Sequence, residues 1–381
     1  MRILMVGHEW FSDHAGGGGR YLHAAASGLA ARGHAVTVLV PRQGTGLPEE
    51  MPQPGLRLLR AELGERASTW WRGLLRVLPG LVERFGPFDV VHSHFAAMGL
   101  VPLWHPCLKS TRRIGQFQGP WAIESRWAGH SPLSCGLRWA IERLAYARCH
   151  RHVVLSRAFA ELLAATYGVD PARIEVVPAG VDTDRFKPAD DRAALRAQLG
   201  VAHQRVCLAT RRLVQRMGLD VLLRAWSQVA PQHSQARLVL AGEGPLRGEL
   251  EALTDRLGLR AQVTFLGRIA DDELVAWNQA ADLAVLPTRD LEGFGLATVE
   301  ALACGTPVIG TQASATPEIL GPLDAGLLVP PADVDAMASR LGAWLEGRAP
   351  GPSREACRNH VLAHYTWPRA IDRLERILAG N

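Results

Sequence analysis

The chain has 381 residues, 48% of them hydrophobic, which suits two α/β domains of ordinary size with buried cores. The apolar run after Met1 ends at Gly7 and is too short for the apolar region of a secretory signal. No stretch approaches the roughly 18 apolar residues of a membrane span. Six scattered cysteines without a Cys-x-x-Cys spacing argue against a disulfide framework or a zinc site. We therefore expect a cytoplasmic protein.

The net charge of +5 is unevenly distributed along the chain. Residues 1–180 hold 20 Lys/Arg and 13 Asp/Glu, whereas residues 181–381 hold 22 and 24. The first half therefore favours an acidic partner, such as an anionic lipid surface or a phosphorylated acceptor. No basic tail, zinc pattern or RNA-binding motif supports nucleic acid as that partner.

Strand and helix signals alternate through the first half. A helix over 20–32 has an apolar face that includes Leu22 and Leu29, and it ends at Gly33. Apolar runs predict strands near 2–6, 35–40, 89–93, 113–117, 152–155 and 174–177.

The alternation repeats in the second half. Strands are predicted near 205–210, 236–241, 262–266, 282–286, 307–310 and 326–329, with helices that include 218–230, 245–257, 271–280 and 332–346. Two successive β-α-β series predict two Rossmann-like parallel sheets. Such sheets bind ligands at the carboxyl ends of their strands, so we expect the active site in a cleft between them.

The boundary between the domains is expected where Pro178 and Gly180 follow a strand. It separates a first domain, residues 1–178, from a second, residues 179–366. The last segment, about 354–379, is predicted to be helical with a break at Trp367–Pro368.

Segment 291–300 contains the residues that indicate a ligand-binding site most clearly. Glu292 and Glu300 stand eight positions apart around a Gly-Phe-Gly turn. The glycines allow close backbone approach to a ligand, and the helix that begins there offers unpaired N–H groups and the positive end of its dipole to a phosphate. A carboxylate at position 300 needs donors among its apolar neighbours, and a sugar diol supplies two. The alternative is a buried glutamate paired with an arginine.

These residues resemble the signature of the retaining GT-B glycosyltransferases of family four, and the order of segments along essentially the whole chain supports the resemblance. The signature consists of Glu292, Gly293, Phe294, Gly295, Glu300, Ala301, Gly305, Pro307 and Val308. The resemblance implies the GT-B fold, an α/β architecture of two Rossmann-like, doubly wound parallel-sheet domains facing across a cleft. It also implies that a final helix, about 367–381, packs back on the first domain.

The resemblance also implies roles for individual residues. Glu292 contacts the donor sugar, Glu300 holds the ribose of the nucleotide, and His94 lies beside the reacting sugar. His92, two residues earlier on the same face of its strand, is expected to be a satisfied structural histidine. The further residues implied at the donor or its nucleotide are Gly17, Gly18, Gly19, Gly242, Gly244, Arg268, Gly293, Phe294, Gly295 and Leu296.

Segment 210–220 departs from the family at one cation. The family usually shows Gly-Arg-Leu, three variable residues and Lys-Gly, whose Arg and Lys clamp the diphosphate. Arg212 matches that arginine, but Met217 stands where the lysine is expected. We expect Arg216 to substitute, because Arg serves phosphate at least as well as Lys. The alternatives are a donor bound differently and an impaired protein.

The acceptor side is expected in the first domain, where Gly119, Trp121 and Glu124 follow a strand. Trp121 is equally suited to stacking on a sugar ring and to packing. Segment 70–79 is amphipathic, aromatic and basic, which is typical of membrane contact, although an ordinary covering helix is the favoured interpretation. The charge of the first half still predicts weak peripheral binding to an anionic membrane at its cytoplasmic face.

The sequence therefore predicts a retaining hexosyltransferase of EC class 2.4, with a nucleotide-diphosphate sugar, UDP-linked, as donor and a hydroxyl group as acceptor. Its product belongs to glycan, glycolipid or glycosylated-metabolite biosynthesis. Arginines and a helix dipole neutralise the phosphates, so no cofactor and no metal is expected. The alternatives are a sugar-nucleotide hydrolase or epimerase on the same fold and, because of Met217, a non-catalytic sugar-nucleotide-binding subunit.

Overall fold

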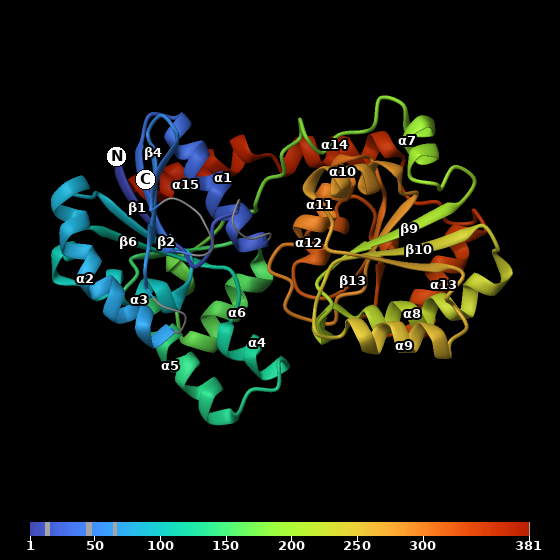
Figure 1. Ribbon diagram of the computed structural model, residues 1–381, viewed down its shortest axis with the longest axis horizontal. Coiled ribbons are helices and arrows are strands. Elements are labelled where there is room, and N and C mark those ends of the chain that lie inside the picture. The colour runs from blue at the N-terminus through green and yellow to red at the C-terminus, as the bar shows by residue number, and fades with distance from the viewer. Residues whose placement is uncertain (12–15, 43–47, 64–66, 381) are drawn as a thin grey trace. The chain divides into compact units, whose positions relative to one another are not determined.

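The computed structural model describes residues 1–11, 16–42, 48–63 and 67–380. The chain folds into two compact units, each built on one sheet. Unit 1 comprises Met1–Gly180 together with Trp367–Asn381, and unit 2 comprises Val181–Thr366 (Figure 1). The family fold expected from the sequence, two Rossmann-like α/β units, is confirmed.

Unit 1 is built on an eight-stranded sheet in the order β3-β4-β2-β1-β5-β6-β7-β8. All neighbouring strands run parallel except the edge pair β3–β4. The strands are β1 (Arg2–Val6), β2 (Ala35–Pro41), β3 (Glu49–Gln53), β4 (Leu56–Ala61), β5 (Val90–Ser93), β6 (Arg112–Phe117), β7 (Arg151–Val154) and β8 (Ile174–Val176).

Helices cover this sheet, and the last of them comes from the end of the chain. The helices are α1 (Gly17–Ala31), α2 (Ala67–Phe85), α3 (Ala96–Trp104), α4 (Trp121–Trp127), α5 (Pro132–Ala147), α6 (Arg157–Tyr167) and α15 (Trp367–Ala379), with 3-10 turns η1 (Pro106–Leu108) and η2 (Pro171–Arg173). Helix α15 packs against α1, where a Cβ on Gly28 would meet Ile371 at 2.7 Å. Arg32 at the end of α1 pairs with Asp372 and Glu375 of α15.

Unit 2 is built on a six-stranded parallel sheet in the order β11-β10-β9-β12-β13-β14. Its strands are β9 (Arg205–Thr210), β10 (Ala236–Ala241), β11 (Val263–Gly267), β12 (Leu283–Leu286), β13 (Val308–Thr311) and β14 (Leu328–Val329). Successive residues of β9 enter different cores: Cys207 and Ala209 on one face, Val206 and Leu208 on the other. Both faces are therefore buried, which explains why these strands read as continuous apolar runs.

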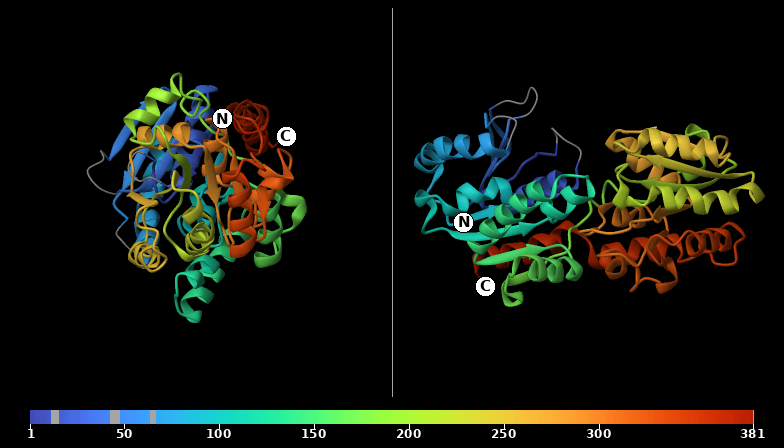
Figure 2. Two further views of the ribbon diagram at one scale, coloured as in Figure 1. Left: turned by 90° about the vertical axis from the view of Figure 1, so that its right-hand side faces the viewer. Right: turned by 90° about the horizontal axis from the view of Figure 1, so that it is seen from below.

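The helices of unit 2 lie on both faces of that sheet. In Figure 1, α8 and α9 lie on one side of the strands and α10 and α11 on the other, and Figure 2 gives two further views. The helices are α7 (Arg192–Gln198), α8 (Leu219–Val229), α9 (Arg247–Arg256), α10 (Asp271–Ala280), α11 (Leu296–Ala303), α12 (Thr316–Leu320), α13 (Val334–Leu345) and α14 (Arg354–His364), with 3-10 turns η3 (Gln215–Met217), η4 (Ala230–Gln232) and η5 (Ala325–Leu327).

Most predicted elements are confirmed within a few residues, and helix 271–280 is confirmed at both ends. The prediction missed the edge strand β3 and its neighbour β4. Strand β3 has the sequence Glu-Glu-Met-Pro-Gln and buries none of its residues, so it carries no apolar alternation to detect.

The helices raise one further point about membranes. No helix in the part of the chain that the structure describes combines the length and the apolar character needed to cross a bilayer.

Candidate functional site

The loops after β9 and β12 meet at the carboxyl edge of the second sheet because these two strands are neighbours. Gly218 has a φ of +69°, and a Cβ there would approach the carbonyl oxygen of Pro287 to 1.9 Å. The Arg289 amide donates to the carbonyl of Arg216 at 2.8 Å, and its guanidinium lies 2.5 Å from the Asp220 carboxylate. Segments 211–220 and 287–295 therefore form one structure.

A buried ion pair joins the two segments. Arg211 Nη1 lies 2.7 Å from Glu292 Oε2, and both residues are buried. A second guanidinium nitrogen of Arg211 donates to Thr288 Oγ1 at 3.0 Å. The carboxylate expected to meet the donor sugar thus already has a cationic partner, which the sequence analysis did not identify. The sequence feature that could have indicated this partner is the pair Arg211–Arg212 directly after a buried strand.

The two arginines expected at the diphosphate lie in different environments. Arg212 is exposed, whereas Arg216 is buried and its guanidinium donates to the carbonyl of Leu291 at 2.8 Å. Leu291 has a φ of +57°, a strained value for a non-glycine residue. Arg216 therefore braces the loop that carries Glu292. Met217 is also buried.

The turn after β10 packs tightly on the same region. Gly242 and Gly244 have φ values of +143° and +159°, and Cβ atoms there would approach the carbonyl oxygens of Arg211 and Leu213 to 1.9 and 2.4 Å. No side chain larger than hydrogen fits at either position without moving the backbone. Arg268, at the end of β11, is exposed.

The Gly-Phe-Gly turn leads into α11 as predicted. Gly295 precedes the helix with a φ of +93° and no side-chain cap, and Phe294 packs its ring on Tyr365 with centroids 5.7 Å apart. Glu300 is buried on this helix. Several polar atoms in these loops are buried without a hydrogen-bond partner among the described residues. They are Thr210 Oγ1, Arg211 Nε, Arg289 Nε and Thr298 Oγ1. Buried polar groups are normally bonded, so these atoms suit a bound polar ligand.

In unit 1 a carboxylate occupies the start of the glycine-rich helix. The Gly19 amide donates to Glu9 Oε1 at 2.9 Å, and a Cβ on Gly16 would meet that oxygen at 2.7 Å. A Cβ on Gly18 would meet Gln118 Oε1 at 2.6 Å. An anionic ligand at Gly17–Gly19 would have to compete with Glu9, which the sequence analysis did not anticipate. Ala15, the first residue of this stretch, lies outside the described residues.

The two histidines of β5 and its end are buried together, with ring centroids 4.2 Å apart. Burial lowers the pKa of His92 to about 3, against a small opposing effect of Gln116. Burial, with His92 and His8 nearby, puts the pKa of His94 well below its ordinary value. Both rings are therefore neutral at pH 7. No ring nitrogen of either has a partner of strict hydrogen-bond geometry among the described residues, although the Gln116 side chain acts on the pKa of His92 as a hydrogen-bond partner would. That His92 is satisfied stays a prediction.

The acceptor-side candidates lie at the start of α4. Glu142, buried on α5, accepts hydrogen bonds from the Trp121 and Ala122 amides at 2.8 and 3.0 Å and from the Tyr167 hydroxyl at 2.7 Å. Burial still raises the pKa of Glu142 to about 7. The Trp121 ring packs edge-on against Phe95, with centroids 5.6 Å apart. Sequence analysis missed Glu142, although a lone carboxylate in an apolar helix face was a visible signal.

The remaining acceptor-side candidates are Gly119 and Glu124. A Cβ on Gly119 would lie 3.3 Å from Glu124 Oε1, so the two residues are neighbours. Within the residues that the structure describes, no group of three or more His, Cys, Asp or Glu side chains is arranged to hold a metal ion. The candidates thus form two groups. In unit 2, Glu292, Arg216 and the turn glycines are joined by direct contacts; in unit 1 the candidates lie around β1, β5 and α4.

Comparison with known proteins assigns both halves of the chain to glycosyltransferase families. The family model described as "Glycosyltransferase Family 4" matches residues 15–185, and that described as "Glycosyl transferases group 1" matches residues 191–361. The chain is 29% identical over 391 residues to a GDP-mannose-dependent alpha-(1-6)-phosphatidylinositol monomannoside mannosyltransferase of Mycolicibacterium smegmatis, covering 100% of this chain and 98% of that protein. It is 32% identical over 311 residues to D-inositol 3-phosphate glycosyltransferase 1 of Catenulispora acidiphila, covering 77% and 73%.

Solved structures agree on the fold. Sucrose-phosphate synthase from Thermosynechococcus elongatus superposes with a TM-score of 0.85 at 22% identity, covering 100% of this chain and 99% of that one. Anabaena HepE in complex with UDP-glucose superposes with a TM-score of 0.80 at 19% identity, covering 100% of both chains. At these identities the likeness establishes the architecture alone.

Proposed function

The chain belongs to glycosyltransferase family 4, and on that premise we propose that it transfers mannose from GDP-mannose to a hydroxyl group of a phosphorylated polyol acceptor. The donor differs from the UDP-sugar expected from the sequence. A relative aligned over the whole chain is named for GDP-mannose, and this supports the change. Two relatives are named for inositol phosphates or their lipids, and the excess of positive charge in residues 1–180 suits such an acceptor.

The observation that carries the proposal is the set of polar groups at the carboxyl edge of the second sheet. A buried cation, a buried carboxylate and several unpartnered donors lie beside an open helix start, where a sugar diphosphate would satisfy them. Glu300 would accept from the ribose hydroxyls. Glu292, with the amides that follow it, would position the mannose.

In the proposed reaction the bond between mannose C1 and the β-phosphate oxygen breaks, and a bond between C1 and the acceptor oxygen forms. Arg212 and the amides at the start of α11 stabilise the charge that develops on the departing GDP. Arg216 acts by holding the Glu292 loop, and the neutral His94 offers a hydrogen bond to the sugar. The acceptor proton passes to the departing phosphate on the same face, so the anomeric configuration is retained. Arginines and amides supply the positive charge, so turnover needs no divalent metal.

The test is a single-turnover reaction with purified protein, GDP-mannose and inositol 1-phosphate or a phosphatidylinositol mannoside, analysed by mass spectrometry. The expected product is a mannosyl acceptor with the α linkage, formed equally well after EDTA treatment. UDP-glucose in place of GDP-mannose should give much less product. Free mannose without any acceptor product would favour the hydrolase alternative.

A second candidate, a non-catalytic sugar-nucleotide-binding subunit, is favoured by two observations. Met217 is buried where a lysine is usual, and Arg211 already pairs with the donor-site carboxylate Glu292. Tight GDP binding with no product from any acceptor would support this candidate.

Peripheral contact with an anionic membrane belongs to the same proposal, and we propose a different contacting surface from segment 70–79. Trp71 donates to the Ala97 carbonyl at 2.8 Å and Trp70 packs on the core, so α2 is a covering helix. On α5, however, Leu133, Leu137 and Leu144 are 86%, 64% and 51% exposed. They project within about 40° of one another around the helix. We place the membrane contact at these three leucines, and the positive charge of the unit favours an anionic bilayer.

A further inference from the structure

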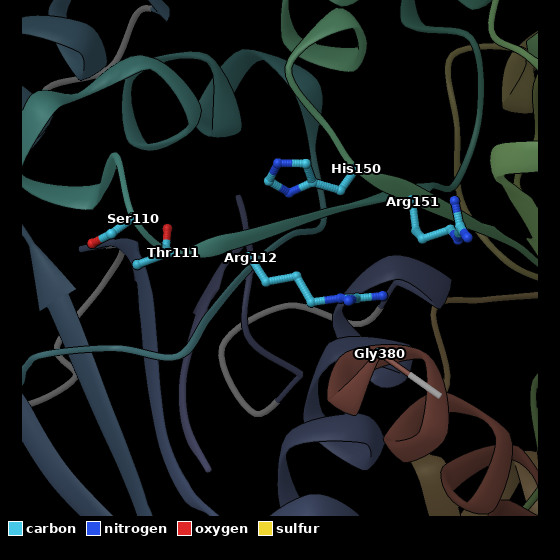
Figure 3. A pocket seen from close by; sticks show the side chains of 6 residues that line it. All are labelled: Ser110, Thr111, Arg112, His150, Arg151 and Gly380. Carbon is cyan, nitrogen blue, oxygen red and sulfur yellow. The ribbon is translucent and has the colours of Figure 1, made fainter.

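A cavity lined by basic residues lies at the amino ends of β6 and β7, away from the loops that hold the candidate site of unit 1. Its volume is about 430 Å³. Figure 3 shows Arg112 reaching towards Gly380 at the end of the chain, while His150 and Arg151 come from the neighbouring strand. The residues that line it are Ser110, Thr111, Arg112, His150, Arg151 and Gly380.

Two hydrogen-bond donors face each other beside this cavity, one of them on its lining residue His150. The backbone amide of Arg113 donates to His150 Nδ1 at 3.0 Å, so the proton of the neutral ring sits on Nε2. That Nε2 lies 3.2 Å from the guanidinium Nη2 of Arg113, which is also a donor. Two donors cannot satisfy each other, and an anion between them would accept from both.

More arginines converge here than acids. The Nε atoms of Arg112, Arg113 and Arg148 are buried without a hydrogen-bond partner among the described residues. Among the described residues, the acidic contact of Arg151 is long, 4.0 Å to Glu175. Burial lowers the pKa of His150, and Arg113, Arg112, Arg148 and Arg173 lower it further. This positive potential favours a multiply charged anion.

A second basic cavity on the same sheet provides a contrast. It is lined by Arg2, Arg57 and Arg84, among others. There Arg2 donates to the Gly86 carbonyl at 2.7 Å, and Arg57 and Arg84 lie 3.1 and 3.0 Å from the Glu49 carboxylate. Those arginines lie within 3.1 Å of a carboxylate or carbonyl oxygen, whereas the contact between Arg151 and Glu175 is 4.0 Å long.

We propose that the cavity lined by Arg112, His150 and Arg151 is a binding site for a phosphate-bearing anion, separate from the glycosyl-transfer site. The phosphate accepts from His150 Nε2, beside the Arg113 guanidinium, and Arg112 and Arg151 hold its remaining oxygens. The volume accommodates a small organic phosphate or a phosphorylated lipid headgroup. The site does not depend on the proposed function.

The probe is inorganic pyrophosphate, titrated while the Cε1–H signal of His150 is followed by NMR with saturating GDP present throughout. Saturating GDP keeps pyrophosphate out of any donor site, so a shift of the His150 signal indicates binding at this cavity. Because the signal comes from His150 itself, the measurement also works if GDP does not bind. A bound anion stabilises the imidazolium and should raise the pKa of His150 by at least about half a unit. Burial and the charges of Arg113, Arg112, Arg148 and Arg173 lower the pKa of the free protein's His150, and the other charged groups near it are Arg151 and Glu175.

The double variant Arg112→Gln/Arg151→Gln should weaken pyrophosphate binding at least about tenfold, because two charge-assisted contacts are lost. Arg72→Gln/Arg76→Gln, exposed on α2, removes the same charge from the same unit and should leave affinity unchanged. Phosphatidylcholine vesicles with and without a phosphoinositide distinguish a lipid headgroup from a soluble phosphate as the bound anion. A response to both probes identifies a headgroup, and a response to pyrophosphate alone identifies a soluble phosphate. A His150 signal that neither probe shifts, or equal weakening in both double variants, would overturn the site.

Discussion

Arg211 and Glu292 form a buried ion pair 2.7 Å long between two loops that are about eighty residues apart in sequence. The pair sits where the donor sugar is proposed to bind, so Arg211 orients the carboxylate before any ligand arrives. Its removal leaves a buried charge alone, which commonly costs about 3–5 kcal/mol.

The variant Arg211→Met should therefore lower the free energy of unfolding of unit 2 by roughly 3 kcal/mol. The double variant Arg211→Met/Glu292→Gln should recover most of that loss, because no buried charge remains. Urea unfolding monitored by tryptophan fluorescence measures both, since Trp226 and Trp277 are buried in this unit. A strictly additive double variant would show that the pair contributes no coupling.

Arg216 offers a test of loop positioning. Arg216→Ala removes the hydrogen bond to Leu291 and should cut kcat about a hundredfold, since the Glu292 loop loses its brace. Met217→Ala, at the adjacent buried position, is the matched control and should leave kcat nearly unchanged. Arg216→Lys should restore only part of the rate, because a lysine lacks the planar fork. Steady-state kinetics with one donor decide this, and equal rates for Arg216→Ala and wild type would remove Arg216 from the site.

Glu300 tests the nucleotide assignment. Glu300→Ala should weaken GDP binding at least about tenfold, because two charge-assisted hydrogen bonds to the ribose diol are lost. Calorimetry with GDP measures the change, and Glu318→Ala, on the neighbouring helix α12, serves as a control. An unchanged GDP affinity in Glu300→Ala would contradict the ribose role.

Glu142 should give the protein a pH dependence. Its pKa is raised from 4.5 to about 7, so the folded state holds this proton more tightly than the unfolded state. The contribution of Glu142 to stability is therefore present below about pH 4.5 and is lost as pH rises towards about 7. Glu142→Gln should flatten that part of the stability profile of unit 1, measured by urea unfolding. Glu161→Gln, exposed on α6, should leave the slope as in wild type.

Membrane contact can be tested by co-sedimentation with anionic vesicles. Binding should be weak and should fall as salt screens the surface charges. Leu137→Ser/Leu144→Ser should reduce binding at least about tenfold, since each leucine contributes about 1.5–3 kcal/mol when it leaves water. Leu75→Ser is a control on α2, where that leucine is 53% exposed. If Leu75→Ser loses vesicle binding and the double variant does not, the membrane contact lies on α2 and not on α5.

The fold could be predicted from the sequence because the buried strands of both sheets are apolar on two faces. Between these strands lie segments with the apolar periodicity of helices. The prediction for β9, Arg205–Thr210, holds to the residue for this reason. The edge strand β3 was missed because pairing with β4 maintains it, and nothing in its own side chains records that pairing.

The candidate site was predictable where a local pattern encodes it, as in the turn before α11 and the glycines after β10. It was not predictable where two distant segments meet. The partner of Glu292 depends on β9 and β12 being neighbours in the sheet, an order that the chain sequence does not state. The carboxylate of Glu9 at the start of α1 was missed for the same reason.

The place of α15 has a consequence for how this chain can be divided. Its apolar face consists of Ala370, Ile371, Leu374, Ile377 and Leu378, all buried within the unit that the first 180 residues begin. Topologically, the second unit, Val181–Thr366, is an insertion between the two segments of the first, Met1–Gly180 and Trp367–Asn381. A protein fragment that ends after β8 would contain every strand of the first sheet. It would lack α15, so the face of α1 that α15 covers would be exposed. Exchange of the second unit between relatives therefore requires two crossover points, and a single join would separate the first unit from its own last helix.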